Sequence, residues 1–169
     1  MGNGLTFRRN LVGLEDVRVG VGYLADEVAA RLRRHGLKCT ALQVNIKDPA
    51  LKTISRQKQL EAETDLSREL AEAAVALVTA NWDLRQPIRA ITVTAMGLTD
   101  EATPRQTSLF GEPGQDPRHR RRARLEQALD GLRDRFGPDA VAAAGVLGSD
   151  LGLMENKARP RAEEEEPDP

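Results

Sequence analysis

The sequence predicts an α+β fold in which two helices pack on one face of a four-stranded, mainly antiparallel sheet. In some stretches apolar residues recur at every second position, as in a half-buried strand, and in others they recur every three or four positions, as in an amphipathic helix. These stretches follow one another through residues 1–97 in the order β-α-β-β-α-β. Two helices cannot cover both faces of such a sheet, so we expect one face to stay open to solvent or to a ligand.

The first half of this domain is predicted to be a short strand, Gly4–Arg9, followed by a helix from about Glu15 to His35. Its buried stripe should comprise Val21, Leu24, Val28 and Leu32. Gly36 then ends the helix. The alternation in Lys38–Lys47 predicts a half-buried strand. The face expected to be buried holds Thr40, Leu42, Val44 and Ile46, and the other holds Ala41, Gln43, Asn45 and Lys47.

The second half continues with a turn at Asp48–Ala50 and a polar strand over Leu51–Leu60, which together complete a hairpin. A second helix is expected from about Asp65 to Asn81. The last strand should cover Ile88–Ala95, with Ile91 and Val93 inward and Thr92 and Thr94 outward.

Beyond this domain (1–97) the composition changes. Residues 98–117 are rich in Thr, Pro, Gly and charge, which is typical of a linker. Residues 118–147 are predicted to be helical, first as an exposed helix over 118–136. Its apolar stripe would be Leu125, Ala128, Leu129, Leu132 and Phe136. Residues 148–169, which end in an acidic run, are expected to be a disordered tail.

The net charge of −1 hides an asymmetry along the chain. Residues 1–60 hold eleven Lys and Arg against five acids, whereas residues 61–103 hold three against eight. A basic face is a candidate footprint for a polyanion, although an ordinary solvated surface would give the same counts.

Several classes of protein are excluded or disfavoured. The single cysteine rules out a disulfide framework and fits a reducing cytosol. The sequence has neither a signal peptide nor an apolar run of about 20 residues. We therefore expect a cytoplasmic protein without a membrane span. There is no paired-carboxylate motif for Mg²⁺ and no Gly-rich phosphate loop. His35 and His119 are isolated and expected to be solvated, and Cys39 has no partner at metal-ligand spacing. We therefore expect no catalytic, metal or cofactor site in this chain.

The ordered set of segments over residues 2–110 resembles a known family. The segments are Gly4-Leu-Thr-Phe-Arg-Arg9, Val28-Ala-Ala-Arg-Leu-Arg-Arg-His-Gly-Leu37, Cys39-Thr-Ala-Leu-Gln-Val-Asn-Ile-Lys47, Leu51-Lys-Thr-Ile-Ser-Arg56 and Pro87-Ile-Arg-Ala-Ile-Thr-Val93. They are similar to the C-terminal little finger, or polymerase-associated domain, of Y-family translesion DNA polymerases of the DNA polymerase IV class. The resemblance implies a domain that lays its open sheet along duplex DNA and grips the backbone.

Carried over to this sequence, the resemblance implies DNA contacts by basic and hydroxyl side chains of the first three strands. The candidates are Arg8, Lys47, Lys52, Thr53, Ser55, Arg56 and Lys58. The pattern leaves the parity of the third strand open, because strands that grip phosphates often bulge. Any one of these residues could equally be a plain solvated residue.

A second motif, Gln106-Thr-Ser-Leu-Phe110, resembles the pentapeptide that binds the bacterial sliding clamp. Gln106 offers an amide for hydrogen bonds, and Leu109 with Phe110 offers an apolar plug for a pocket. Thr107 departs from the usual leucine, which should weaken binding. The alternative is a loop whose Leu-Phe pair folds back onto the domain.

The resemblance also implies a polymerase catalytic core, in cis or in trans, whose palm would hold the Mg²⁺ ions. That palm is not in this sequence, and the start Met1-Gly-Asn-Gly-Leu-Thr6 resembles the junction after the thumb. We expect the parent protein to be a DNA-directed DNA polymerase and this chain to be inactive alone. The alternative is a free-standing, non-catalytic adaptor that binds the clamp or DNA and regulates other polymerases.

Overall fold

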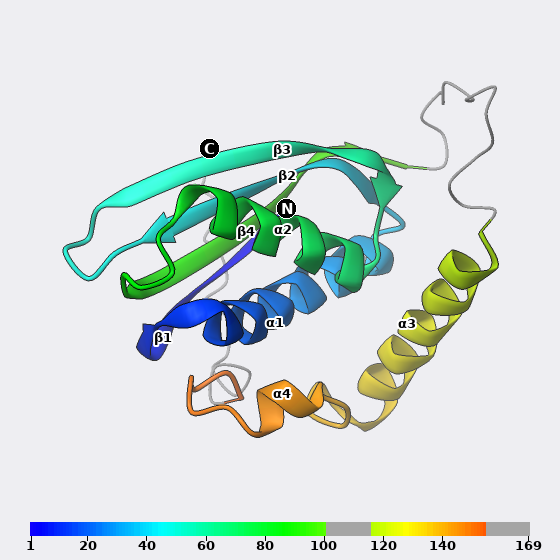
Figure 1. The fold of residues 1–169 in the computed structure, drawn as a ribbon. Coiled ribbons are helices and arrows are strands. Elements are labelled where there is room, and N and C mark those ends of the chain that lie inside the picture. The colour runs from blue at the N-terminus through cyan, green and yellow to red at the C-terminus, as the bar shows by residue number, and fades with distance from the viewer. Residues whose placement is uncertain (101–115, 155–169) are drawn as a thin grey trace, which may run out of the picture.

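The computed structural model describes residues 1–100 and 116–154 (Figure 1). The first region contains β1 (Gly2–Leu11), α1 (Gly13–Arg34), β2 (Lys38–Lys47), β3 (Thr53–Thr64), α2 (Ser67–Asn81) and β4 (Ile88–Thr99). The second contains α3 (Pro117–Phe136) and α4 (Ala144–Leu147).

The four strands form one antiparallel sheet in the order β1-β4-β2-β3. Both α1 and α2 lie on the same side of this sheet (Figure 1). The predicted α+β class, the element order and the placement of both helices on one face are therefore confirmed.

The core lies between the sheet and these two helices, where the predicted periodicities place it. Leu42, Val44 and Ile46 of β2 are at most 1% exposed, as are Ile91 and Val93 of β4. The helices supply the facing side chains, which are Val21, Leu24, Val28 and Leu32 of α1 and Leu70, Ala74 and Val78 of α2. Each large aliphatic side chain buried in this way stabilises the fold by roughly 1.5–3 kcal/mol.

The start of β2 departs from the predicted alternation. Thr40 was expected in the core, but it is only half-buried and Cys39 is fully buried instead. The pairing with β3 shifts at this point: Cys39 lies opposite Thr64, whereas Ala41 lies opposite Gln59. The hydroxyl of Thr40 donates to the carbonyl oxygen of Gly97 at 3.2 Å, and a Cβ on Gly97 would lie only 2.1 Å from that hydroxyl. This close approach, together with a φ of +59° at Gly97, requires a glycine.

The helix α3 was predicted with nearly correct ends, but its apolar stripe is not its packing face. Leu125, Leu132 and Phe136 are 58%, 42% and 66% exposed, and Ala128 is also exposed. Of the predicted stripe, only Leu129 is half-buried. The prediction was wrong because α3 contacts the domain through charged residues.

Ion pairs hold α3 against α1. Arg33 of α1 donates to Asp130 at 2.6 Å and pairs with Glu126, and the side chain of Arg33 is only 8% exposed. Burial by itself would lower the pKa of Arg33, but the carboxylates of Asp130 and Glu126 hold it above its ordinary value. Arg133 donates to Asp26 at 2.7 Å.

Glu126 has a second task at the start of α2. The residue before this helix, Leu66, offers no side-chain cap. The Glu126 carboxylate instead accepts from the backbone N–H of Ser67 at 2.9 Å and from its hydroxyl at 2.9 Å. A negative charge at a helix N-terminus satisfies free N–H groups and the helix dipole. One buried carboxylate thus connects α1, α2 and α3.

Two other expectations for the C-terminal segment are corrected. Disorder was expected from residue 148, but Leu151 and Leu153 are each 1% exposed, and the backbone N–H of Arg8 donates to the Leu151 carbonyl at 3.1 Å. Their apolar side chains extend the core beside β1. His119 was expected to be solvated, but it is half-buried and its Nδ1 lies 3.1 Å from Glu69 Oε1.

Candidate nucleic-acid interface

The face of the sheet away from α1 and α2 is built from small and polar side chains. Opposite residues of an antiparallel ladder point to the same face, so the registers assign this face from the buried residues. Three cross-strand rows result, which are Gly2–Thr94–Gln43–Gln57, Gly4–Thr92–Asn45–Ser55 and Thr6–Ala90–Lys47–Thr53. We call this surface the open face.

Two glycines of β1 lie directly beside threonines of β4 on the open face. A Cβ on Gly4 would lie 2.4 Å from Thr92 Oγ1, and one on Gly2 would lie 2.7 Å from Thr94 Oγ1. Neither glycine could be replaced by a larger residue without moving the threonine beside it. Because these two positions have no side chain, a rigid ligand could approach the backbone of β1 closely at this edge of the sheet.

The open face carries hydrogen-bond donors suited to phosphate oxygens and few groups that could recognise bases. Amide, hydroxyl and ammonium groups such as those of Gln43, Thr92 and Lys47 can donate to phosphate oxygens. The Gln43 amide also donates to Asn45 Oδ1 at 3.1 Å, which aligns the two amides. Among the described residues of the three rows there is no aromatic side chain.

The structure brings three of the seven candidate DNA contacts together on the open face. Lys47 lies directly opposite Thr53, and Ser55 follows Thr53 on the same side of β3. All three side chains are exposed. Lys52 precedes β3 in the adjoining turn, where its backbone N–H donates to Asp48 Oδ1 at 2.9 Å and its side chain is exposed.

Two other candidates lie on the opposite side of the same strand. Arg56 pairs with Val44 and Lys58 with Leu42, whose side chains are in the core, so both point to the helix side of the edge strand β3. Arg56 donates from Nε to Asn81 Oδ1 at 3.0 Å, at the C-terminus of α2. A cation is favourable at that end of a helix, which gives Arg56 a structural role. The register thus decides the strand parity that the sequence left open.

Arg8 occupies a less regular part of β1. It lies between Thr6 and Leu11, where the pairing with β4 shifts, and its side chain is exposed. A Cβ added to Gly152 would lie 3.0 Å from the Cβ of Arg8, so the C-terminal segment lies against Arg8. Arg8 is therefore at the border of the open face and not within a row.

The centre of the open face consists of residues absent from the candidate set. Gln43, Asn45, Thr92 and Thr94 occupy the two inner strands. The alternation already placed them outward, so the sequence did contain a signal for them. They were missed because the candidate set was limited to basic and hydroxyl side chains of the first three strands, which leaves out the amides of β2 and the threonines of β4.

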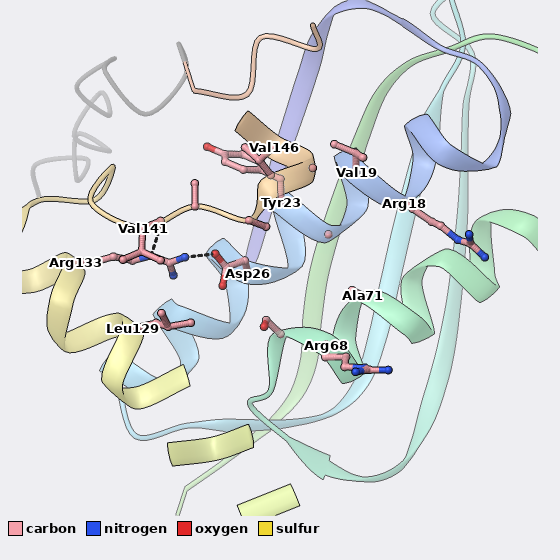
Figure 2. Close-up of a pocket in the computed structure, with 15 residues that line it drawn as sticks. Arg18, Val19, Tyr23, Asp26, Arg68, Ala71, Leu129, Arg133, Val141 and Val146 are labelled. Carbon is pink, nitrogen blue, oxygen red and sulfur yellow. Dashed lines mark hydrogen bonds and ion pairs between the residues drawn. The ribbon is translucent and has the colours of Figure 1, made fainter. Parts of the chain in front are cut away.

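A concave feature lies on the helix side of the molecule. A cavity of about 460 Å³ is bounded by α1, the start of α2, α3 and the segment before α4 (Figure 2). Its wall is mainly apolar and includes Val19, Tyr23, Ala71 and Leu129, and the Arg133–Asp26 ion pair lies beside it (Figure 2). None of the candidate residues contributes to it. No cluster of metal-ligating side chains is present, and no helix is long and apolar enough to cross a membrane, in residues 1–100 and 116–154.

Comparison with known proteins gives a family for this architecture. Residues 1–109 match the model of the impB/mucB/samB family C-terminal domain. The chain belongs to this family. The resemblance to the C-terminal region of Y-family polymerases, which the sequence predicted, is confirmed.

The similar curated proteins are DNA polymerases IV. The chain is 36% identical over 153 residues to DNA polymerase IV of Acetivibrio thermocellus and 32% identical over 153 residues to that of Moorella thermoacetica. These matches cover 90% and 87% of this chain but only 37% and 36% of the two polymerases. The impB/mucB/samB C-terminal domain and the segment after it thus span little more than a third of these relatives.

Among solved structures, the chain is similar to the little finger domain of PolIV in a complex with the beta-clamp processivity factor. That match has a TM-score of 0.45 at 15% identity and covers 64% of this chain and 96% of that one. The clamp-binding motif predicted at Gln106, Leu109 and Phe110 lies outside the described residues.

Proposed function

We propose that this chain is the DNA-binding accessory domain of a translesion polymerase and that it grips the DNA backbone through the open face. The observation that carries the proposal is the uncovered sheet face on which Lys47, Thr53 and Ser55 lie beside amides and threonines. Such a surface supplies many donors to phosphates and few groups that could read bases. Binding should therefore be independent of sequence and strongly weakened by salt.

The test compares two pairs of lysine and arginine residues from the same hairpin. Lys47→Ala with Lys52→Ala removes two charges on or next to the open face, whereas Arg56→Ala with Lys58→Ala removes two from the helix side of β3. Each phosphate contact contributes about 0.9 to the slope of log K against log salt. We expect the first variant to lower the slope by about two and the second to leave it unchanged, as measured by fluorescence anisotropy on duplex DNA. Equal slopes for the two variants, or a strong preference for one DNA sequence, would contradict this function.

We also propose that Gln106, Leu109 and Phe110 dock on the bacterial sliding clamp. The support is the pentapeptide pattern and its position at the end of the residues that match the family, 1–109. A short peptide in a preformed pocket should bind with about micromolar affinity, or ~8 kcal/mol. Leu109→Ala with Phe110→Ala should abolish most of this binding in calorimetry, without lowering the melting temperature. A double variant that binds the clamp as well as the wild type would make the motif a coincidence.

The domain would act with a polymerase catalytic core, in cis or in trans, in DNA damage tolerance in the cytoplasm. The support is that the curated relatives are DNA polymerases IV about three times as long as the matched segment. Mg²⁺ would then belong to the core. Purified chain should incorporate no nucleotide alone, and template-dependent incorporation by it would refute an accessory role.

A further inference from the structure

The first part of α3 carries an unusual density of arginine. Residues 117–125 include Arg118, Arg120, Arg121, Arg122 and Arg124 and no acidic residue. The side chains of Arg118, Arg121 and Arg124 are exposed. Among the described residues none of these three forms an ion pair.

These arginines stand at the unfavourable end of their helix. The N-terminus of a helix carries a partial positive charge, so cations there oppose helix formation. The first turn of α3 contains no acidic residue. Asp116 before the helix, which accepts from the Arg118 backbone N–H at 2.9 Å, and Glu69 of α2, which lies against His119, offset only part of the positive charge. Helix stability therefore does not explain why five arginines lie there. An anionic ligand would.

The anchoring of α3 turns this cluster toward solvent. Glu126, Asp130 and Arg133 fix the opposite side of the helix to α1, and Glu126 also accepts hydrogen bonds from Ser67 of α2. His119 adds its contact to Glu69 near the N-terminal end. Arg121 and Arg124 are one turn apart on the remaining side, so both can face the same ligand. The ion pairs thus hold the exposed arginines in a fixed orientation.

We propose that the N-terminal half of α3 is a second nucleic-acid contact, in which Arg121 and Arg124 bind the phosphate backbone. The guanidinium group matches phosphate oxygens with two parallel hydrogen bonds. This inference rests on the proposed DNA-binding function but uses a surface on the helix side of the sheet. Such a site would hold a length of nucleic acid beyond the part that lies on the open face.

Other polyanionic surfaces fit this site less well. A helix that lies on a membrane needs a free apolar side, and the side of α3 opposite the arginines is occupied by the ion pairs to α1. A protein partner usually needs an apolar anchor in the middle of the contact. Of the large exposed apolar groups of α3, Leu132 and Phe136 lie in its C-terminal half, away from Arg121. Leu125 alone lies within one turn of Arg121, and leucine is under-represented among the anchor residues of protein interfaces.

The experiment measures DNA binding by the full chain with Arg121→Ala and Arg124→Ala combined. The matched control is Arg18→Ala with Arg85→Ala, which removes the same charge from two exposed positions elsewhere. Binding is followed by fluorescence anisotropy over a range of KCl, with a blunt duplex and with the same duplex carrying a single-stranded extension. Loss of two phosphate contacts should lower the salt slope by about two in the Arg121 and Arg124 variant and by less than one in the control. A loss on both probes assigns the site to duplex, and a loss only on the extended probe assigns it to single strand.

The outcomes separate this inference from the proposed function. If the Arg121 and Arg124 variant matches the control while Lys47→Ala with Lys52→Ala still lowers the slope, the second contact is refuted and the open-face function stands. If neither pair changes the slope, both are refuted. Vesicles of phosphatidylcholine and phosphatidylserine test whether the arginines bind an anionic membrane instead of nucleic acid. Arginine-dependent binding to these vesicles with no effect on DNA would also refute the proposal.

Discussion

The helices α1 and α3 are similar in length, with 22 and 20 residues, but they are attached to the molecule by different forces. Nine residues of α1 are buried, and they are apolar apart from the tyrosine hydroxyl. In α3 a single residue is buried, and that residue is Glu126. The comparison shows that an apolar stripe identifies the buried side of a helix only where hydrophobic packing attaches the helix to the domain. Where ion pairs provide it, an apolar stripe can face solvent.

The largest effect should come from breaking the ion pairs of α3. Arg33→Ala leaves Glu126 without its cation in a poorly solvated site and leaves Asp130 with only the longer pair to Arg133 at 3.7 Å. Breaking such a buried pair typically destabilises by about 3–5 kcal/mol. Urea unfolding should show this loss, and hydrogen exchange should show faster opening of α3. Arg34→Ala is the control, because it removes the neighbouring exposed charge and should cost less than about 0.5 kcal/mol. Equal effects of the two substitutions would mean that α3 is not held by ion pairs.

A pair of leucines tests the other side of the comparison. Leu24 of α1 is fully buried, whereas Leu132 of α3 is 42% exposed. Leu24→Ala should destabilise by about 2–5 kcal/mol through lost burial and a residual cavity. Leu132→Ala should stay within about 0.5 kcal/mol. A loss above 2 kcal/mol at Leu132, in the same urea titration, would show that this side of α3 is covered in solution.

The sequence predicted most of the sheet and little of the attachment of α3, for a physical reason. Alternating residues such as Val44 and Ile46 are visible in sequence because the period of a strand is fixed by covalent geometry. The pairing of Arg33 with Glu126 joins residues 93 apart, and no local pattern distinguishes those two charges from solvated ones. The same applies to Arg56, whose side of β3 depends on the register with β2. For the interface, the sequence identified the open face and its hydroxyls but not which cations share it.

Alkaline pH should destabilise the fold through Cys39, whose thiol is buried in the core. Burial of this thiol raises its pKa from 9.0 to about 11. A group with a raised folded-state pKa stabilises the fold fully below the unfolded value and loses that contribution as pH rises toward the folded value. Stability should therefore fall between about pH 9 and 11, by at most about 1.4 kcal/mol per pH unit. Cys39→Ala should show a smaller fall over this range in urea unfolding, and identical pH profiles would contradict the assignment.

Acid should weaken the C-terminal attachment, and this is the smallest expected effect. Arg9 of β1 donates to Asp16 of α1 and to Asp150 of the C-terminal segment. The hydrogen bonds from Arg9 hold the pKa of both carboxyl groups below the usual range. A group with a lowered folded-state pKa stabilises the fold above its unfolded value and loses that contribution as pH falls. The attachment of residues 149–154 to β1 should thus loosen below about pH 4.

The expected size is modest because Arg9 is 43% exposed and solvent screens the pairs. Asp16→Asn should cost about 0.3–1 kcal/mol at pH 7, since it also removes a negative charge from the first turn of α1. Asp150→Asn should change global stability less, but it should speed hydrogen exchange at Leu151 and Leu153. Since neither asparagine can be protonated in this range, both variants should show a flatter acid limb than the wild type. An acid limb that keeps its steepness in both variants would mean that the carboxyl groups of Asp16 and Asp150 do not link the two regions.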